Sequence, residues 1–238
     1  MTEPLWRDAY ATECEATVLE TGPEGATLDR TVFYPAGGGQ PGDSGALEWE
    51  GGACAVAEAV KGATPGAVLH RLAEGATPPP AGARVRARID AERRALHRRV
   101  HTALHLLSVV IPLPVTGGQI AAGKGRLDFD MTEPPEDREA LESRLNALIA
   151  ADHPVVEQWI TEAELEADPG LVKTSGVKPP RGAGSIRLIR IGADEAPVDR
   201  QPCGGTHVRS TAEIGRVTLG KIEKKGRRNR RVQLLLAG

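Results

Sequence analysis

The feature that most restricts the fold is a series of short runs, alternating apolar and polar residues, between Ala16 and Ile89. Runs such as ATVLE, ALEWE and VRARI are separated by Gly and Pro, with turn signals about every 8–12 residues, a spacing typical of a small barrel or sandwich. The strongest break is EGATPPPAGA at residues 74–83, although residues 84–89 still have a strand pattern. We therefore predict a small β-barrel over residues 1–89, with a domain boundary directly after Ile89.

The second part of the chain, residues 90–238, mixes helical and strand patterns. Asp90 is a suitable N-cap for a helix that runs to about Ile111, where Pro112 stops it. The sequence TEPP precedes a second amphipathic helix, and TEAE at residues 161–164 has the form of a capping box that opens a third. VVEQWI, SIRLIRI, RVTLGKI and RRVQLLL are typical of strands. We predict an α+β domain, with helices packed on a mostly antiparallel sheet.

The composition limits the class of protein. No run approaches the roughly 18 apolar residues of a membrane helix, and the mixed, acidic N-terminus is unlike a signal peptide. Three widely spaced cysteines, Cys14, Cys54 and Cys203, argue against a disulfide framework. We expect a reduced, cytoplasmic protein that has no membrane partner and for which no obligate protein partner is evident.

Two pairs of residues, each four positions apart, have the spacing of metal ligands. In RRVHTALHLL, His101 and His105 would project from the same face of the predicted helix. In CGGTHV, Cys203 and His207 flank a glycine-rich segment that favours a tight turn. One thiolate and three imidazoles suit Zn²⁺, so we predict one zinc ion per chain.

The spacing alone leaves other interpretations open. Histidines four apart also arise by chance, and His97 and His101 share that spacing. Thr102 follows His101 where a zincin HExxH motif needs glutamate, so a metalloprotease is disfavoured. Four protein ligands make a closed site, which is normally structural, whereas catalytic zinc keeps an open position.

Three motifs in sequence resemble one family. HTALHLL, CGGTHV and EIGRVTLGKIEKKGRRNRR are similar to the editing domain of alanyl-tRNA synthetases and their free-standing AlaX-type relatives. LDRTVFYPAGGGQPGDSG resembles the matching stretch of the β-barrel that precedes that domain, so the resemblance covers about residues 10–236. It implies that His101, His105, Cys203 and His207 are zinc ligands.

The resemblance also implies a substrate pocket. It points to substrate-binding roles for Thr31, Gln119, Asp199, Thr206 and Gly38, with Thr31 and Gln119 as candidates for sensing the amino-acid side chain. After Gln119 the chain has Ile120, Ala121 and Ala122 where the family often has Gln-x-Gly-Ser. The backbone N–H groups of Gly204 and Gly205 are candidates to steady an oxyanion. The glycine motif that contains Gly38 lacks the Lys-Ser/Thr ending of a P-loop, which favours a turn between strands.

The activity that the resemblance implies is hydrolysis of tRNA(Ala) mischarged with serine or glycine. A pocket for alanine excludes glycine poorly, because one missing methyl group is worth about 1–3 kcal/mol, and it rejects serine poorly for the same reason. A second site must then remove the wrong products, with zinc positioning or polarising a water. This chain has no P-loop, so we expect it to act in trans on released aminoacyl-tRNA.

Two basic blocks stand out in a chain whose net charge is −2. Seven arginines lie within residues 84–99, and three lysines and four arginines lie within residues 221–231. The second block could contact tRNA phosphates near the acceptor stem and 3′ end; its candidate RNA-binding residues are Lys221, Lys224, Lys225, Arg227, Arg228 and Arg230. An ordinary solvated surface is the alternative for each block.

Two rival functions fit parts of the same pattern. A non-catalytic, zinc-stabilised RNA-binding module would use the four ligands as a closed structural site. A metallohydrolase of small esters or amides would also fit the ligands, but the basic blocks argue against it. The Thr31, Gln119 and glycine-motif positions favour the editing hydrolase, because a binding module needs no lined amino-acid pocket.

Overall fold

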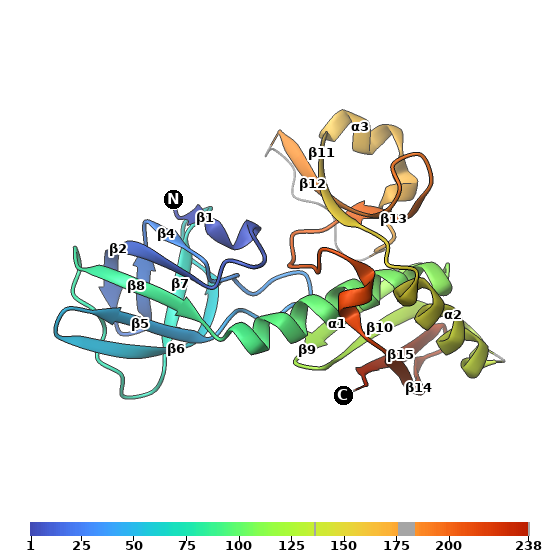
Figure 1. The fold of residues 1–238 in the computed structure, drawn as a ribbon, viewed down its shortest axis with the longest axis horizontal. Coiled ribbons are helices and arrows are strands. Elements are labelled where there is room, and N and C mark those ends of the chain that lie inside the picture. Colours follow the sequence, from blue (N-terminus) through green and yellow to red (C-terminus); the bar gives the residue numbers. More distant parts are fainter. Residues whose placement is uncertain (136, 176–183, 238) are drawn as a thin grey trace. The chain divides into compact units, whose positions relative to one another are not determined.

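The computed structural model describes residues 1–135, 137–175 and 184–237, and Figure 1 shows its secondary structure. The chain divides into two compact units, Met1–Ala95 and Leu96–Gly238, which are described separately below. Among the described residues, no helix has the length and apolar character needed to cross a membrane.

The first unit is a closed six-stranded barrel, which confirms the predicted barrel. Its strands, each antiparallel to its neighbours, follow the order β2-β3-β7-β6-β5-β8, and β8 closes the ring against β2. Alternate residues face inward, as in β8, where Val85, Ala87 and Ile89 are buried and the residues between them are exposed. The barrel strands are β2 (Glu13–Gly22), β3 (Gly25–Leu28), β5 (Gly45–Trp49), β6 (Gly52–Lys61), β7 (Val68–Leu72) and β8 (Arg84–Ile89). Short β1 (Glu3–Pro4) pairs with β4 (Arg30–Thr31), and a 3-10 helix, η1, covers Leu5–Arg7.

The glycine-rich motif forms a tight turn, as predicted. The amides and carbonyls of Gly37 and Gln40 exchange two hydrogen bonds of 3.0 Å. Between them, Gly38 and Gly39 have φ angles of 59° and 83°, which only glycine adopts readily. The turn is followed by Asp43, whose carboxylate forms a buried ion pair with Arg94.

The second unit contains two antiparallel sheets, so the single predicted sheet is divided. The four-stranded sheet has the order β14-β15-β10-β9 and the three-stranded sheet the order β11-β12-β13. The strands are β9 (Val115–Ala121), β10 (Lys124–Asp130), β11 (Val155–Thr161), β12 (Ser185–Gly192), β13 (Pro197–Pro202), β14 (Val217–Gly226) and β15 (Asn229–Leu236). The helices are α1 (Ala91–Val110), which begins in the first unit, α2 (Arg138–Ala150) and α3 (Glu162–Ala167), with 3-10 helices η2 (Pro169–Leu171) and η3 (Thr211–Ile214).

Helix α1 shares its core with both sheets. Its Val100, Leu104 and Leu107 belong to one buried cluster with Leu127 of β10 and Ile189 of β12. The predicted helix start is confirmed, since the Asp90 carboxylate accepts the Arg93 amide at 3.0 Å. The predicted capping box of α3 is present as well. With its helices and sheets, the chain has the α+β class that the sequence predicts.

Candidate metal centre

Four donor side chains from two distant segments lie together in the second unit. They are His101 and His105 of α1, and Cys203 and His207 of the segment after β13. Their ligand atoms all lie within 4.8 Å of one another. Cys203 Sγ lies 3.4 Å from His101 Nε2 and 3.2 Å from His207 Nε2. His101, His105 and His207 are buried, and Cys203 is half-buried.

Local structure explains how the Cys203 segment presents its donors. The Cys203 amide donates to the Arg187 carbonyl at 3.2 Å, which extends the pairing of β12 and β13 by one residue. The Arg187 guanidinium donates to the carbonyls of Cys203 and Gly205 at 2.8 and 2.9 Å. The Gly205 amide points back at Cys203 Sγ, 3.5 Å away. Arg187 therefore fixes the loop from the sheet side.

Hydrogen bonds at the far side of two rings aim their Nε2 atoms at the cluster. His105 Nδ1 lies 2.9 Å from the Asp199 carboxylate. His207 Nδ1 lies 3.1 Å from Thr102 Oγ1, whose own proton goes to the Arg98 carbonyl. Both rings thus direct Nδ1 to a partner outside the cluster and turn Nε2 toward it, an arrangement common for metal-ligating histidines.

Asp199 lies behind the cluster and orients one of its ligands. It is 2% exposed and accepts hydrogen bonds from His105, from Lys173 and, at 2.8 Å, from Gln201. Burial opposes its charge, but His105 and Lys173 outweigh that effect and lower its pKa to about 2. These contacts orient the His105 ring, and the substrate-binding role that the resemblance implies for Asp199 stays a prediction.

The electrostatics of the cluster favour a thiolate. Burial alone would raise the pKa of Cys203, but His101 and His207 hold it well below its usual value. Burial and the charge of His101 lower the pKa of His207 to about 3. Burial also acts against charge on His105, yet its bonds to Asp199 and Cys203 raise its pKa to about 9. The site therefore supplies an anionic sulfur at Cys203 and a neutral imidazole at His207, which are the forms that bind metal, whereas His105 would release a proton when it binds a metal.

The donor set fits zinc. In a tetrahedral site with Zn–S of about 2.3 Å and Zn–N of about 2.0 Å, sulfur and nitrogen lie roughly 3.5 Å apart. The two S···N distances of 3.4 and 3.2 Å match this spacing. Borderline-soft ions such as Zn²⁺ prefer mixed sulfur and imidazole donors.

Thr31 lies in the barrel unit, where its hydroxyl is already used. It is fully buried, lies 2.8 Å from His70 Nε2, and accepts the Phe33 amide at 3.1 Å. His70 Nδ1 donates to the Ala26 carbonyl at 3.1 Å, so its Nε2 accepts the Thr31 proton. These contacts give Thr31 a packing role, and its implied role in sensing substrate stays a prediction. Gly38 is exposed in the glycine turn, and its implied substrate-binding role also stays a prediction.

The remaining predicted pocket residues occupy different environments. Gln119 is exposed on β9, where its side-chain carbonyl accepts Arg126 Nε at 3.2 Å. Thr206 is 1% exposed beside His207. Gly204 is exposed, whereas Gly205 is buried and its amide is directed at the Cys203 sulfur.

The basic block on β14 and β15 is only partly available to bind phosphate. Five of its six predicted RNA-binding residues are exposed: Lys221, Lys224, Lys225, Arg227 and Arg228. Two of these already have acidic partners, since Lys225 pairs with Glu223 and Arg228 with Asp130.

Arg230 corrects the sequence interpretation. It is 6% exposed, and its guanidinium donates to the backbone carbonyls of Gly226, Asn229 and Thr132. It therefore stabilises the β14–β15 hairpin from inside rather than meeting RNA.

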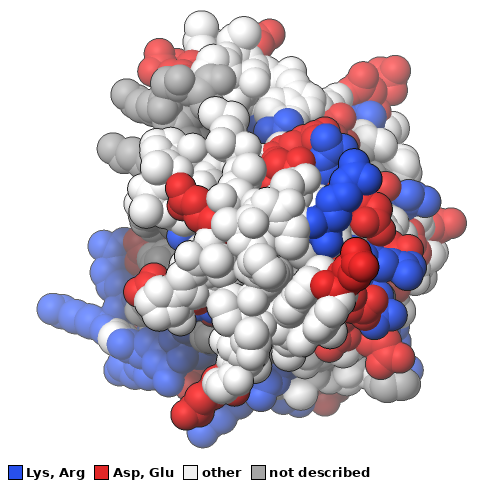
Figure 2. Space-filling view, turned by 90° about the vertical axis from the view of Figure 1, so that its left-hand side faces the viewer, with Lys and Arg blue, Asp and Glu red and all other residues white. Residues whose placement is uncertain are grey.

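On the face drawn in Figure 2, basic and acidic side chains surround a broad uncharged area, consistent with the small net charge.

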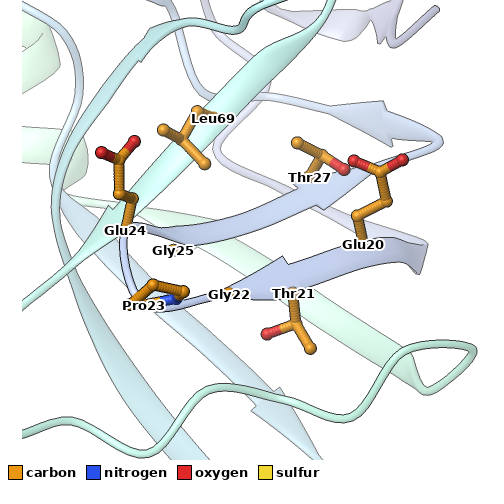
Figure 3. A pocket seen from close by; sticks show the side chains of 8 residues that line it. All are labelled: Glu20, Thr21, Gly22, Pro23, Glu24, Gly25, Thr27 and Leu69. Carbon is orange, nitrogen blue, oxygen red and sulfur yellow. The ribbon is translucent and has the colours of Figure 1, made fainter.

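A pocket of about 200 Å³ lies in the barrel unit, at the β2–β3 hairpin (Figure 3). Its lining includes the carboxylates of Glu20 and Glu24 and the side chains of Thr27 and Leu69. None of the predicted site residues lines it. Two carboxylates without a cationic partner in the lining would repel a phosphate-bearing substrate, so we assign it no role.

Several supporting residues were missed by the sequence analysis. They are Thr102, Lys173, Arg187 and Gln201, which hold the ligands or the Asp199 carboxylate. Gln201 could have been found from the sequence, since strand alternation places it on the same face as Asp199 and Cys203. Arg187 offered none, because its partners lie 16 and 18 positions away in the chain.

Comparison with known proteins places the chain in a family. The family model described as the second additional domain of threonyl and alanyl tRNA synthetases matches residues 186–233, and the model of class II (A) tRNA synthetases matches residues 8–93. An alanine–tRNA ligase of Pyrobaculum neutrophilum is 37% identical over 93% of this chain. The chain spans only 25% of that ligase and of its Pyrobaculum arsenaticum counterpart.

Smaller relatives match from end to end. The alanyl-tRNA editing protein AlaX-M of Methanosarcina acetivorans is 34% identical, with 99% of both chains covered. The protein of the same description from Methanosarcina barkeri is 35% identical, again with 99% of both covered. The chain therefore belongs to the AlaX-M family of alanyl-tRNA editing proteins.

Proposed function

We propose that this protein is a trans-editing hydrolase that removes serine or glycine from mischarged tRNA(Ala). The observation that carries the proposal is the cluster of His101, His105, Cys203 and His207 in a chain that matches AlaX-M editing proteins over its full length. The reaction is attack of water on the ester that joins the amino acid to the terminal ribose, with the ribose hydroxyl as leaving group. The protein would act in the cytoplasm, on tRNA released from the synthetase.

The four clustered side chains would hold one Zn²⁺, which when bound supplies a Lewis acid that lowers the pKa of water or polarises a carbonyl. Asp199 and Thr102 orient two of the ligands from behind. Cys203 is occupied by this arrangement, so we assign no covalent nucleophile. The exposed Gly204 backbone is our candidate for steadying the oxyanion.

Discrimination against alanine requires a polar group for the serine hydroxyl. Gln119 is our candidate, because its side chain is exposed and its carbonyl is already oriented by Arg126. Such a group would be left unpaired by alanine, which would protect the correct product. Lys221, Lys224 and Arg227 are our candidates for phosphate contacts near the acceptor stem.

The test is a deacylation time course on seryl-, glycyl- and alanyl-tRNA(Ala), with chelator-stripped and zinc-restored protein. We expect loss of serine or glycine, sparing of alanine, and recovery of the rate with zinc. A closed site of four protein ligands is also what a structural zinc requires. If folded, zinc-loaded protein binds tRNA(Ala) but hydrolyses none of the three esters, the non-catalytic RNA-binding module is the better assignment.

A further inference from the structure

One aromatic side chain stands apart from the others in its exposure. The chain has three Trp, two Tyr and two Phe, all in the part that the structure describes. Trp159 of β11 is 47% exposed, whereas the other six are buried or half-buried. An exposed tryptophan in a protein with so few aromatics is a candidate contact for a ligand.

Trp159 lies on the sheet face that carries the metal centre. It pairs with Arg187 of β12, and two residues further along β12, Ile189 pairs with Gln201 of β13. Because side chains alternate along a strand, Trp159, Arg187 and Gln201 share one face, and Asp199 and Cys203 follow the same alternation. Asp199 and Cys203 contact His105 and His101 from this face.

The spacing along this row suits one aminoacylated nucleoside. Arg187 pairs with Trp159 on one side, and its carbonyl accepts the Cys203 amide on the other. Neighbouring strands lie about 4.8 Å apart, so the Trp159 and Cys203 backbones are separated by roughly 10 Å. A terminal nucleoside carries its base at one end and the ester on its ribose at the other. A base on Trp159 would therefore bring the ester toward the Cys203 end of the row.

The surroundings of the ring favour a single flat ligand. Arg187 forms an ion pair with Glu157 at 2.6 Å, which holds its guanidinium in place. Thr161 and Ser185, also on this face, are exposed and polar. Among the described residues, the ring is bordered by polar groups, and so small an apolar area suits base stacking better than a stable protein interface.

We infer that Trp159 is the stacking surface for the base of the 3′-terminal nucleotide, and that Arg187 ties this surface to the loop that carries Cys203. The inference rests on the proposed function, since it names how that substrate is held. Trp159 acts on binding alone and does not take part in the bond-breaking step.

The test uses the zinc-loaded full chain and 3′-deoxy-3′-(L-serylamino)adenosine, whose amide replaces the ester. A matched probe lacks the adenine base. We expect Trp159→Leu to weaken binding of the adenine probe about tenfold or more, and Trp159→Phe to retain most of it. The base-free probe should bind wild type and Trp159→Leu equally. Zinc content identical to wild type shows that the variant retains the metal centre.

The outcomes separate this inference from the proposed function. With seryl-tRNA(Ala), Trp159→Leu should raise KM and leave kcat close to wild type. Trp159→Leu could instead hydrolyse seryl-tRNA(Ala) normally, with the KM of the wild type and undiminished probe binding. That result would overturn the inference and leave the proposed function standing. The wild type could also bind the probe through its base but hydrolyse no ester. If Trp159→Leu then abolished that binding, the result would support the base site and contradict the proposed function.

Discussion

At the scale of single residues, the metal centre depends on groups behind its ligands. We predict that Asp199→Asn weakens zinc binding about 10- to 100-fold, because the neutral amide holds the His105 ring less firmly and leaves Lys173 without its counter-ion. Competition against a chelator measures this. Asp194→Asn is the matched control, since that exposed carboxylate pairs with Arg190 away from the cluster. Equal zinc affinity in the two variants would contradict the positioning role.

Thr31 gives a second test at this scale. We predict that Thr31→Val lowers the free energy of unfolding by about 1–3 kcal/mol, because the His70 Nε2 atom and the Phe33 amide are deprived of a buried partner. The ratio of serine to alanine hydrolysis should stay unchanged. Chemical denaturation and deacylation measure the two effects, with half-exposed Thr27→Val as control. A changed ratio at unchanged stability would contradict the packing role and support the sensing role that the resemblance implies.

His70 makes the stability of the barrel unit depend on pH. Burial lowers its pKa from 6.5 to about 4 in the folded state. Between these values the unfolded chain binds a proton that the folded chain does not, so stability decreases as pH falls from about 6.5 to about 4. The full decrease is about 3 kcal/mol. We predict that His70→Gln has a correspondingly flatter stability profile over this window, measured by denaturation of the full chain. If wild type and His70→Gln lost stability equally between pH 6.5 and 4, the assignment of this pH dependence to His70 would be contradicted.

At the scale of elements, α1 packs closely against the four-stranded sheet at Gly125 of β10. A Cβ added at Gly125 of β10 would lie 2.6 Å from Val100 Cγ1 and 3.0 Å from Leu104 Cδ1. We predict that Gly125→Ala lowers the free energy of unfolding by about 1–3 kcal/mol, because α1 cannot approach the sheet without strain. Gly117→Ala in β9 is the control, since its nearest neighbour would be 3.6 Å away. Thermal denaturation of both variants measures the difference. Equal midpoints for Gly125→Ala and Gly117→Ala would contradict the close packing of α1 on Gly125 as the cause.

The elements that sequence could predict are those with a local signal. The α1 stripe, the Asp90 cap and the capping box at Thr161 depend on neighbours within one or two turns, and all are present. The division into two sheets has no local signal, because strand pairing joins residues far apart in the chain. The ligand pairs could be found by their spacing. Their convergence, and the burial of Arg230 against backbone carbonyls, are long-range packing results.

At the scale of the whole molecule, the RNA-binding role that we propose for the basic block on β14 and β15 can be tested by the response of tRNA binding to salt. We predict that affinity for uncharged tRNA(Ala) falls as salt rises. Replacing Lys224 and Arg227 together by Ala should lower the slope of log K against log salt by about one for each phosphate that the variant no longer neutralises. These side chains reach solvent, whereas the buried guanidinium of Arg230 is not available to phosphate. Arg138→Ala removes an exposed charge from α2 in the same unit and should leave the slope unchanged. Because phosphate contacts position the substrate without taking part in ester cleavage, the double variant should raise KM and spare kcat. A slope that changes equally in the variant and the control would move the RNA-binding surface away from β14 and β15.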